Sequence, residues 1–313
     1  MRQNFRWIVV LGCIVVFAAF PFLLGEYWLH TAILSLFYVM MASSWNLLAG
    51  YTGQVSFAHA AFAAVGAYAS GLSALYWHLP PLLTALFGAG IAALLGLALG
   101  ALCIRMGGIY LSLTTLAFSE ILRIILDNEY EITRGTMGLQ VPFFFPTYSK
   151  VSAFYLMFVV TIGMLSLIFW LIHSDLGTSF RAVQNDETAA ASLGINIVRV
   201  RIVAFVVSSA LAGLAGALYG HYHQLITPEI ASLNTMFLVL AMTVIGGLGT
   251  FSGPIVGALF LEVLSEYIRV YGEFHVLIFG LIALVIARFA PVGLIGLWRK
   301  TSLAKQSSKT IAG

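Results

Sequence analysis

Carboxylates inside long apolar stretches are the first candidates for chemistry in this sequence. Glu120, Glu262 and Glu266 each lie within such a stretch, where a charge is unfavourable unless it faces protein or water. Arg123 follows Glu120 by three residues and Arg269 follows Glu266 by three, a spacing that allows an ion pair on one helix face. These residues indicate structural ion pairs, which we favour, a polar path that a zwitterion can cross, or a proton relay.

Histidines are the second group of candidates. His59 follows a turn that contains Gln54 and Ser56. A histidine among small residues usually forms a hydrogen bond between helices, and the alternative is a place on a translocation path. His221 and His223 alternate, a spacing that suits two metal ligands on a strand better than on a helix. No cysteine or carboxylate is adjacent to them, so we expect no metal site.

A polar stretch at 173–200 separates two apolar segments and carries the signals of a short helix. Asn185 is a good N-cap residue, and Asp186 and Glu187 suit the positive end of a helix dipole. Alanines follow, and Gly194 can end the helix in the left-handed conformation. A helix of about two turns is marginal in water by itself. We therefore expect it to dock on another surface, and the alternative is a capped connector that lies on the membrane.

The composition defines the class of protein that must position these residues. Of the 313 residues, 61% are hydrophobic and 9% are charged, and the mean hydropathy is +0.99. An ordinary soluble domain has about 25% charged residues, so a soluble enzyme and a disordered chain are excluded. The two cysteines, Cys13 and Cys103, lie in apolar runs and do not form a disulfide-rich scaffold. The sequence predicts an all-α, polytopic integral membrane protein.

Ten segments are apolar over about the 20 residues that a membrane-spanning helix needs. They are 7–24, 29–48, 57–76, 82–104, 110–126, 152–172, 202–222, 232–245, 255–271 and 274–289. The first follows Arg2 and Arg6, as in a signal peptide, but no clear small-residue cleavage site follows it, so we expect a retained span. The segments 57–76 and 232–245 are candidates for broken or re-entrant helices.

The positions of the cations orient these spans. With the N-terminus in the cytoplasm, eleven of the 15 Lys and Arg residues fall on the inner side and two in outer loops, while Arg123 and Arg269 lie near outer helix ends. Positive charge gathers on the cytoplasmic side of membrane proteins, so we predict both termini inside. Residues 1–300 then form one transmembrane domain with a cytoplasmic loop at 174–200, and 301–313 form a cytoplasmic tail.

Small residues form two patterns. Two triplets share one spacing at an offset of 196 residues, and each lies at a predicted inner helix junction: Gly50, Gly53 and Ser56, and Gly246, Gly249 and Ser252. Transporters often contain internal repeats, and chance is the alternative. Glycines and serines at near-four spacing predict helices that approach closely, with a pore-facing position as the alternative: Gly66 and Ser70, Gly88 and Gly90, Gly96 and Gly100, Gly213, Gly216 and Gly220, and Gly253 and Gly257.

Several motifs resemble those of one family of membrane transporters. Residues 187–194, Glu-x-Ala-Ala-x-x-x-Gly, resemble the EAA loop of ABC importer permeases. Other motifs are similar to those of the LivM-type branched-chain amino acid permeases, and they occur in order at 47–62, 105–110, 114–118, 133–139, 245–258 and 291–296. Ala58 departs from the family, which usually has Gly before the histidine. The resemblance implies a multi-pass permease of the bacterial inner membrane that is not itself an enzyme.

The resemblance also implies a division of labour among subunits. The loop is the coupling helix that contacts an ATPase, through Arg181, Asp186, Glu187, Ala189, Ala190 and Gly194. The candidates for the translocation path are Gln54, Ser56, His59, Thr114, Glu120 and Glu262. The implied partners are a second, homologous permease subunit that completes a heterodimer, two ABC ATPase subunits, a periplasmic substrate-binding protein and membrane lipid, with no nucleic acid.

We expect no cofactor on this chain and expect ATP to bind to the partner subunits. The four lysines, Lys150, Lys300, Lys305 and Lys309, follow no Gly-x-x-x-x-Gly-Lys-[Ser/Thr] loop, the phosphate-binding motif of many ATPases. The predicted function is uptake of leucine, isoleucine or valine delivered by the binding protein. The alternatives are an ABC permease for urea or another small amide or amino acid, a secondary transporter coupled to Na⁺ or H⁺ through Glu120 or Glu262, and a non-transporting membrane scaffold.

Overall fold

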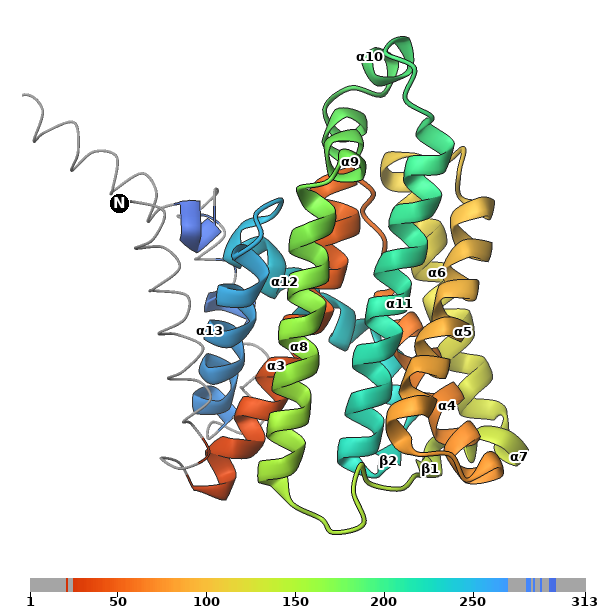
Figure 1. Cartoon of the computed structure of the whole chain (residues 1–313), viewed down its shortest axis with the longest axis vertical. Helices are drawn as coiled ribbons and strands as arrows, with labels where there is room; N and C mark the ends of the chain where they lie inside the picture. The colour runs from red at the N-terminus through yellow and green to blue at the C-terminus, as the bar shows by residue number, and fades with distance from the viewer. Residues whose placement is uncertain are drawn as a thin grey trace, which may run out of the picture.

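The computed structural model describes residues 25–269, together with residues 21, 280–282, 284, 288 and 293–296. The predicted spans 7–24 and 274–289 lie mostly outside the described residues. The other eight each coincide with a helix: α3 (Glu26–Thr52), α4 (His59–Trp77), α5 (Pro81–Leu102), α6 (Gly108–Asn128), α8 (Lys150–Ile172), α11 (Ile197–His223), α12 (Leu233–Gly247) and α13 (Gly253–Ile268). In the described part, α3, α5, α6, α8 and α11 are long and apolar enough to cross a membrane. The bundle is helical, as predicted (Figure 1).

Short elements connect the long helices at both ends of the bundle. They are α7 (Tyr130–Thr133), η1 (Gly135–Met137), β1 (Leu139–Gln140), α9 (Asp175–Asn185), α10 (Glu187–Ser192), β2 (Leu225–Ile226) and η2 (Pro228–Ala231). β1 pairs antiparallel with β2, with Leu139 opposite Ile226. We did not predict this strand pair, because two residues per strand are too few to show a period of two.

Helix α3 lies at the centre of the bundle. In its apolar stretch of membrane-spanning length, 89% of the residues are buried. The helix packs against α8, α11, α12 and α13. In the corresponding stretch of α6, only 22% of the residues are buried. Because lipid gives no hydrophobic driving force between helices, a buried helix depends on close packing with its neighbours. The exposed helices instead present faces that lipid, water or other subunits must cover.

Small residues bring α4 and α11 together, as their spacing predicts. A side-chain carbon at Gly66 would collide with the backbone of Gly213, and one at Gly216 would collide with the backbone of Ala63. The two helices therefore touch backbone to backbone. Gly90 differs, because no atom lies within 4 Å of the position that its side-chain carbon would take. Close packing does not explain the glycine there.

The chain leaves the helical conformation between α3 and α4. Gly53, with φ +72°, ends α3 in the left-handed conformation, and α4 begins only at His59. The predicted span 57–76 thus begins in non-helical chain, in line with the broken-helix prediction. The other candidate, α12, has 15 residues. That is about 22 Å at 1.5 Å per residue, less than the ~30 Å hydrocarbon core of a bilayer.

The two glycine triplets meet in the structure. Gly53 and Gly249 share a φ of +72°, and a side-chain carbon at Gly50 would lie 2.7 Å from the Gly249 nitrogen. The Asn46 side chain accepts a hydrogen bond from the Gly249 amide (2.8 Å) and donates one to the Thr250 carbonyl (2.9 Å). The end of α3 is thereby bonded to the turn between α12 and α13. The shared conformation supports the predicted repeat.

Candidate functional site

Helices α9 and α10 project beyond the rest of the bundle at one end (Figure 1). They join α8 to α11 and occupy the loop predicted at 174–200. We did not predict α9 as a helix. Its Phe180 and Val183 are buried while most of its other residues are exposed, the pattern of a helix with one face on a bundle. The polar composition of this stretch conceals that pattern.

Two contacts fasten α9 to the end of α3. The Gln184 side-chain amide donates to the Gly50 carbonyl (2.8 Å). The Arg181 guanidinium lies 5.6 Å from the centre of the Tyr51 ring, within the range of a cation–π interaction. Arg181, a predicted coupling residue, therefore contacts its own chain, and Gln184 is a connecting residue that we did not predict.

The N-cap of α10 is Asp186, not Asn185. Asp186 has an extended backbone, and its carboxylate accepts hydrogen bonds from the amides of Thr188 (2.8 Å) and Ala189 (3.0 Å). Asn185 is the last residue of α9. The prediction of Asn185 as the cap is wrong by one position, because a cap residue must be non-helical and α9 keeps Asn185 helical.

Glu187 is tied to the bundle by an ion pair. Its carboxylate pairs with Arg201 of α11, and the Arg201 guanidinium also donates to the Ile104 carbonyl (2.9 Å), just beyond α5. The side chain of Arg201 is 13% exposed and that of Glu187 is 50% exposed. Glu187 is therefore fixed in direction while half of it remains available to a partner.

Helix α10 and the residues that follow it to Gly194 form the tip of the α9–α10 projection. This tip presents small and apolar side chains. Ala190 is 1% exposed, whereas Ala189 and Gly194 are exposed. Gly194 has φ +79°, the left-handed conformation that we predicted for the end of this helix. Leu193 is 80% exposed, and we did not single it out. Its only signal in the sequence is its place directly before Gly194, in the motif at 187–194.

The predicted ion pair of Glu120 is present on α6. Arg123 Nε lies 3.2 Å from both carboxylate oxygens of Glu120, and Arg123 Nη1 donates to Asp127 (2.8 Å). These side chains are between 25% and 32% exposed. Thr114 lies on the same helix, with its hydroxyl 3.4 Å from the Met106 sulfur. A charged network thus stands on a helix that the chain itself leaves largely uncovered.

Glu262 and Glu266 lie in α13, on the other side of the molecule from α6 (Figure 1). Each is 5% exposed. Glu266 accepts a hydrogen bond from Tyr27 of α3 and pairs with Arg269 (3.1 Å), so the second predicted ion pair is present. Glu262 and Glu120 therefore do not belong to one site.

Three of the candidates for the translocation path, Gln54, Ser56 and His59, face the interior of the chain. Gln54, Ser56 and His59 are 6%, 0% and 0% exposed. Gln54 donates to the Thr52 hydroxyl (2.9 Å), and the His59 ring packs edge to face against Phe62, with centroids 5.7 Å apart. The Ser56 hydroxyl accepts a hydrogen bond from the Ala58 amide (3.2 Å), so Gln54 and Ser56 bond within the turn, while the His59 ring is held by packing.

Two further features lie away from the projecting tip. His221 of α11 contacts the Ser70 hydroxyl and the Pro142 carbonyl, each at 2.8 Å.

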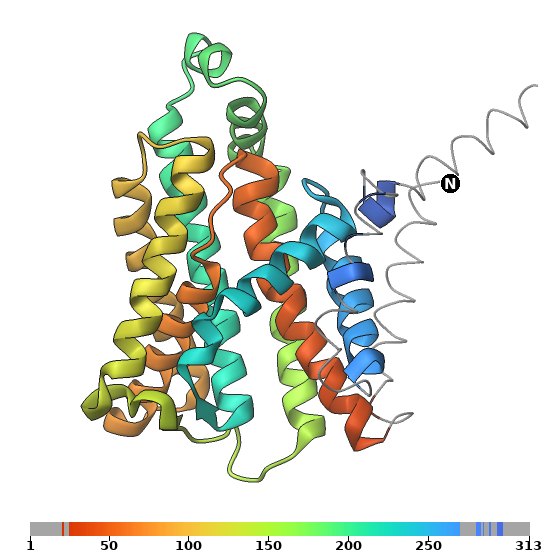
Figure 2. The ribbon, with the colours of Figure 1, turned by 180° about the vertical axis from the view of Figure 1, so that it is seen from behind.

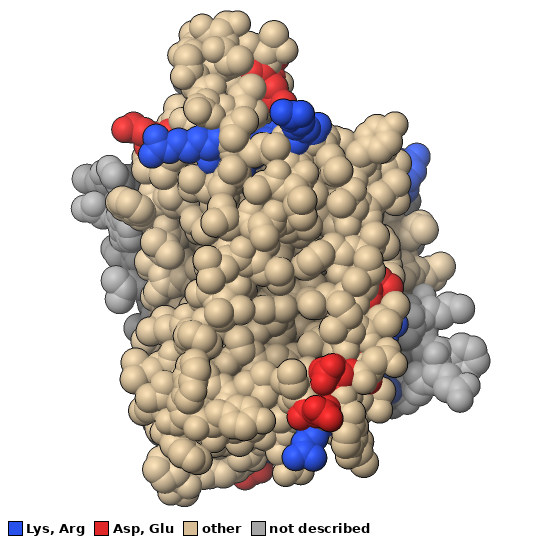
Figure 3. All heavy atoms as spheres, turned by 90° about the vertical axis from the view of Figure 1, so that its right-hand side faces the viewer, with Lys and Arg blue, Asp and Glu red and all other residues tan. Residues whose placement is uncertain are grey.

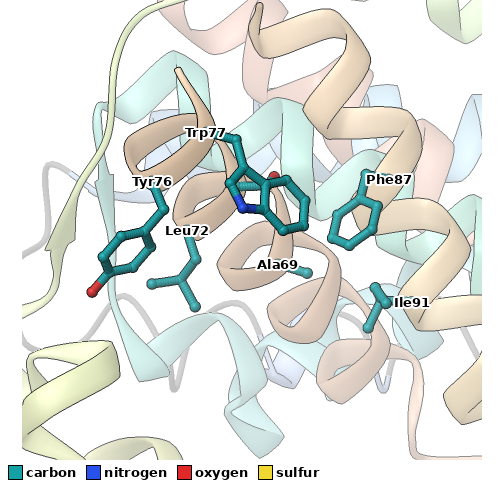
Figure 4. A pocket seen from close by; sticks show the side chains of 7 residues that line it. Ala69, Leu72, Tyr76, Trp77, Phe87 and Ile91 are labelled. Atoms are coloured by element: carbon teal, nitrogen blue, oxygen red, sulfur yellow. The ribbon is translucent and has the colours of Figure 1, made fainter. Parts of the chain in front are cut away.

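A pocket of about 350 Å³ lies between α4 and α5 (Figure 4). Its lining is Ala69, Leu72, Ser73, Tyr76, Trp77, Phe87 and Ile91. This lining is almost wholly apolar and does not suit a zwitterion.

A family model described as "Branched-chain amino acid transport system / permease component" matches residues 27–287. The chain belongs to this family. It is 30% identical to the high-affinity branched-chain amino acid transport system permease protein LivM of Escherichia coli K12, over 93% of this chain and 75% of the relative. It is 29% identical, with the same coverage, to LivM of Salmonella typhimurium. It is 27% identical to LivH of Escherichia coli K12, over 83% of this chain and 91% of the relative.

No solved structure matches this chain significantly. The family assignment confirms the resemblance seen in the sequence motifs and makes the chain a permease component, not an enzyme. The match extends over α3 to α13 and includes the projecting tip.

Proposed function

We propose that this chain is the membrane subunit of an ATP-driven ABC importer that moves branched-chain amino acids into the cytoplasm. The family supports the class of protein, and the EAA-like motif supports the use of ATP through partner subunits. The observation that carries the proposal is the α9–α10 projection, whose base is bonded to α3, to the end of α5 and to α11. A partner that moves the tip therefore moves three helices.

The proposed topology has ten spans, with both termini on the cytoplasmic side of a bacterial inner membrane. Figure 3 shows a broad uncharged band across one face, with charged atoms above and below it, which supports insertion in a bilayer. The tip then faces the cytoplasm, where two ATPase subunits contact it. A second, homologous permease subunit completes the pore, and a periplasmic protein delivers the cargo to the opposite end.

The cargo follows from the names of the relatives, which describe transport of branched-chain amino acids. Urea or another small amide is the competing cargo. Uptake of labelled leucine and labelled urea by cells that express the complete complex separates the two. Saturable leucine uptake is expected, and uptake of urea alone would reject the proposed cargo.

A charge reversal tests the coupling role of the tip. Glu187→Arg is expected to abolish leucine uptake while the protein remains in the membrane, because Arg201 would then face a second cation. Asp175→Arg, at an exposed carboxylate in the first turn of α9, is the matched control on the same side of the bundle and should leave uptake intact. Normal uptake by the Glu187→Arg variant would reject the coupling role.

A further inference from the structure

The non-helical segment between α3 and α4 alternates between buried and exposed residues. Gln54 and Ser56 are buried, whereas Val55 is 36% exposed, Gly53 is exposed and Phe57 is half-buried. An extended chain produces this period of two. One edge of the segment packs into the core of the chain, and the other edge faces away from it.

The segment runs back into the bundle instead of lying at its end. The Trp45 indole donates to the Ser56 carbonyl (2.7 Å). Trp45 lies seven residues before the end of α3, or about 10 Å along the helix. Figure 2 shows the segment descending from the end of α3 to a start of α4 well inside the bundle. Non-helical backbone therefore lies at membrane depth.

Side chains of α6 fix the backbone of this segment. The Ser112 hydroxyl donates to the Val55 carbonyl (2.8 Å), and the Phe57 amide donates to the Thr115 hydroxyl (2.9 Å). These bonds satisfy polar groups that a helix would otherwise satisfy. Non-helical backbone is tolerated at membrane depth only where protein buries it or where it lines a water-filled cavity. The bonds to α6 therefore keep the backbone of this segment away from lipid.

The helices on both sides of the segment, α6 and α12, also carry residues that the chain itself leaves partly uncovered. On one side, α6 carries Ser112 and, further along the helix, the charged network of Glu120 and Arg123. Contact between these charges and lipid would be unfavourable. From α12, Phe237 is 51% exposed, and its ring meets that of Phe57 edge to face with centroids 6.0 Å apart. In Figure 2 the segment lies between α6 and α12 on the side toward the viewer. The three elements thus form one continuous face.

We propose that Val55, Phe57 and Phe237 form the apolar wall of the translocation path and contact the aliphatic side chain of the cargo. This inference rests on the proposed function and names the residues that favour its substrate class. A valine and two aromatic rings suit a branched hydrocarbon and offer nothing to the polar groups of urea. Gln54 and Ser56, which the family motif indicates, lie behind this wall and support it.

Cysteine labelling of the assembled complex tests which edge of the segment faces the path. In a chain whose Cys13 and Cys103 are replaced by alanine, Val55→Cys, Phe57→Cys and Phe237→Cys are expected to react with a charged thiol reagent in membrane fragments open on both sides. Leucine at about ten times its half-saturating concentration should slow these reactions about tenfold. The matched controls are Gln54→Cys, Ser56→Cys and Met236→Cys, at buried positions, and they should not react.

Each other outcome is decisive. Reaction of the cysteines at positions 54 and 56 instead of those at 55 and 57 would overturn the proposal. It would also be overturned if the cysteines at 55 and 57 reacted only with an uncharged, lipid-soluble reagent. The absence of any reaction would overturn it as well. If the turn variants fail to reach the membrane, Phe237→Cys and Met236→Cys carry the same test on α12. Protection by urea in place of leucine would reject the proposed cargo and the apolar selection, while the labelled positions would still identify the path.

Discussion

At the scale of single residues, Arg201 determines how Glu187 is presented. The arginine lies between two acceptors, the Glu187 carboxylate and the Ile104 carbonyl. The planar fork of a guanidinium can serve two acceptors in fixed directions, which the compact ammonium of lysine does less well. The tip is thereby joined to the end of α5 as well as to α11.

Arg201→Gln is expected to lower leucine uptake while leaving the amount of protein in the membrane unchanged. A half-exposed ion pair contributes up to about 1 kcal/mol, which is a factor of about five. Leucine uptake per amount of membrane protein measures the effect. Arg199→Gln, at an exposed neighbouring arginine, is the control. Equal uptake by the two variants would contradict the role given to Arg201.

Asp186→Ala is expected to loosen α10. Loss of a helix cap costs about 1 kcal/mol, so the amides of Thr188 and Ala189 should exchange hydrogen faster in the assembled complex. Asn185→Ala should leave their exchange rates unchanged, because Asn185 is the last residue of α9. Hydrogen exchange measured by mass spectrometry distinguishes the two positions, and the reverse pattern would restore Asn185 as the cap.

Glu120→Gln is expected to reduce uptake only modestly, by a factor of about five or less. Arg123 keeps Asp127 as a partner at 2.8 Å, so no cation is left alone in the span. The initial rate of leucine uptake measures the change. Complete loss of uptake in an assembled complex would place Glu120 among the residues that contact the cargo or carry protons.

At the scale of elements, glycine positions separate the contacts that need close approach from those that do not. Gly66→Ala is expected to lower the unfolding free energy by about 1–3 kcal/mol, because the new carbon would collide with the backbone of α11 and overpack the contact. Gly90→Ala has open space and should be neutral or stabilising by up to about 1 kcal/mol. Thermal unfolding in detergent compares them, and equal midpoints would contradict this account.

Apolar length predicts the long helices well and places the interruption between α3 and α4, but it does not show how deep in the bundle this interruption lies. The segment 53–58 mixes Gly, Gln and Ser with apolar residues, which indicates a turn but not which residues face the core. Which edge faces the core depends on where α3 and α6 lie, so the sequence motif alone pointed to Gln54 and Ser56. The cap of α10 was misplaced for a similar reason, since Asn185 and Asp186 are both good cap residues and only the extent of α9 separates them.

At the scale of the whole molecule, the source of energy separates the proposed importer from a secondary transporter. We expect leucine uptake to stop when cells are depleted of ATP and to continue when ionophores dissipate the Na⁺ and H⁺ gradients at constant ATP. The physical reason is the projecting tip, which we propose as the contact for an ATP-driven partner. The opposite result would favour ion coupling through Glu120 or Glu262.

The contact between the two glycine turns also bears on how the protein is made. Asn46 binds Gly249 and Thr250, about 200 residues later in the chain. At roughly 5–20 residues per second, a ribosome needs about 10–40 s to synthesise that interval. During this time α3 is already available for insertion, while the amide of Asn46 still lacks the partners it has in the finished bundle. Assembly of the centre of the molecule therefore waits for the last third of the chain.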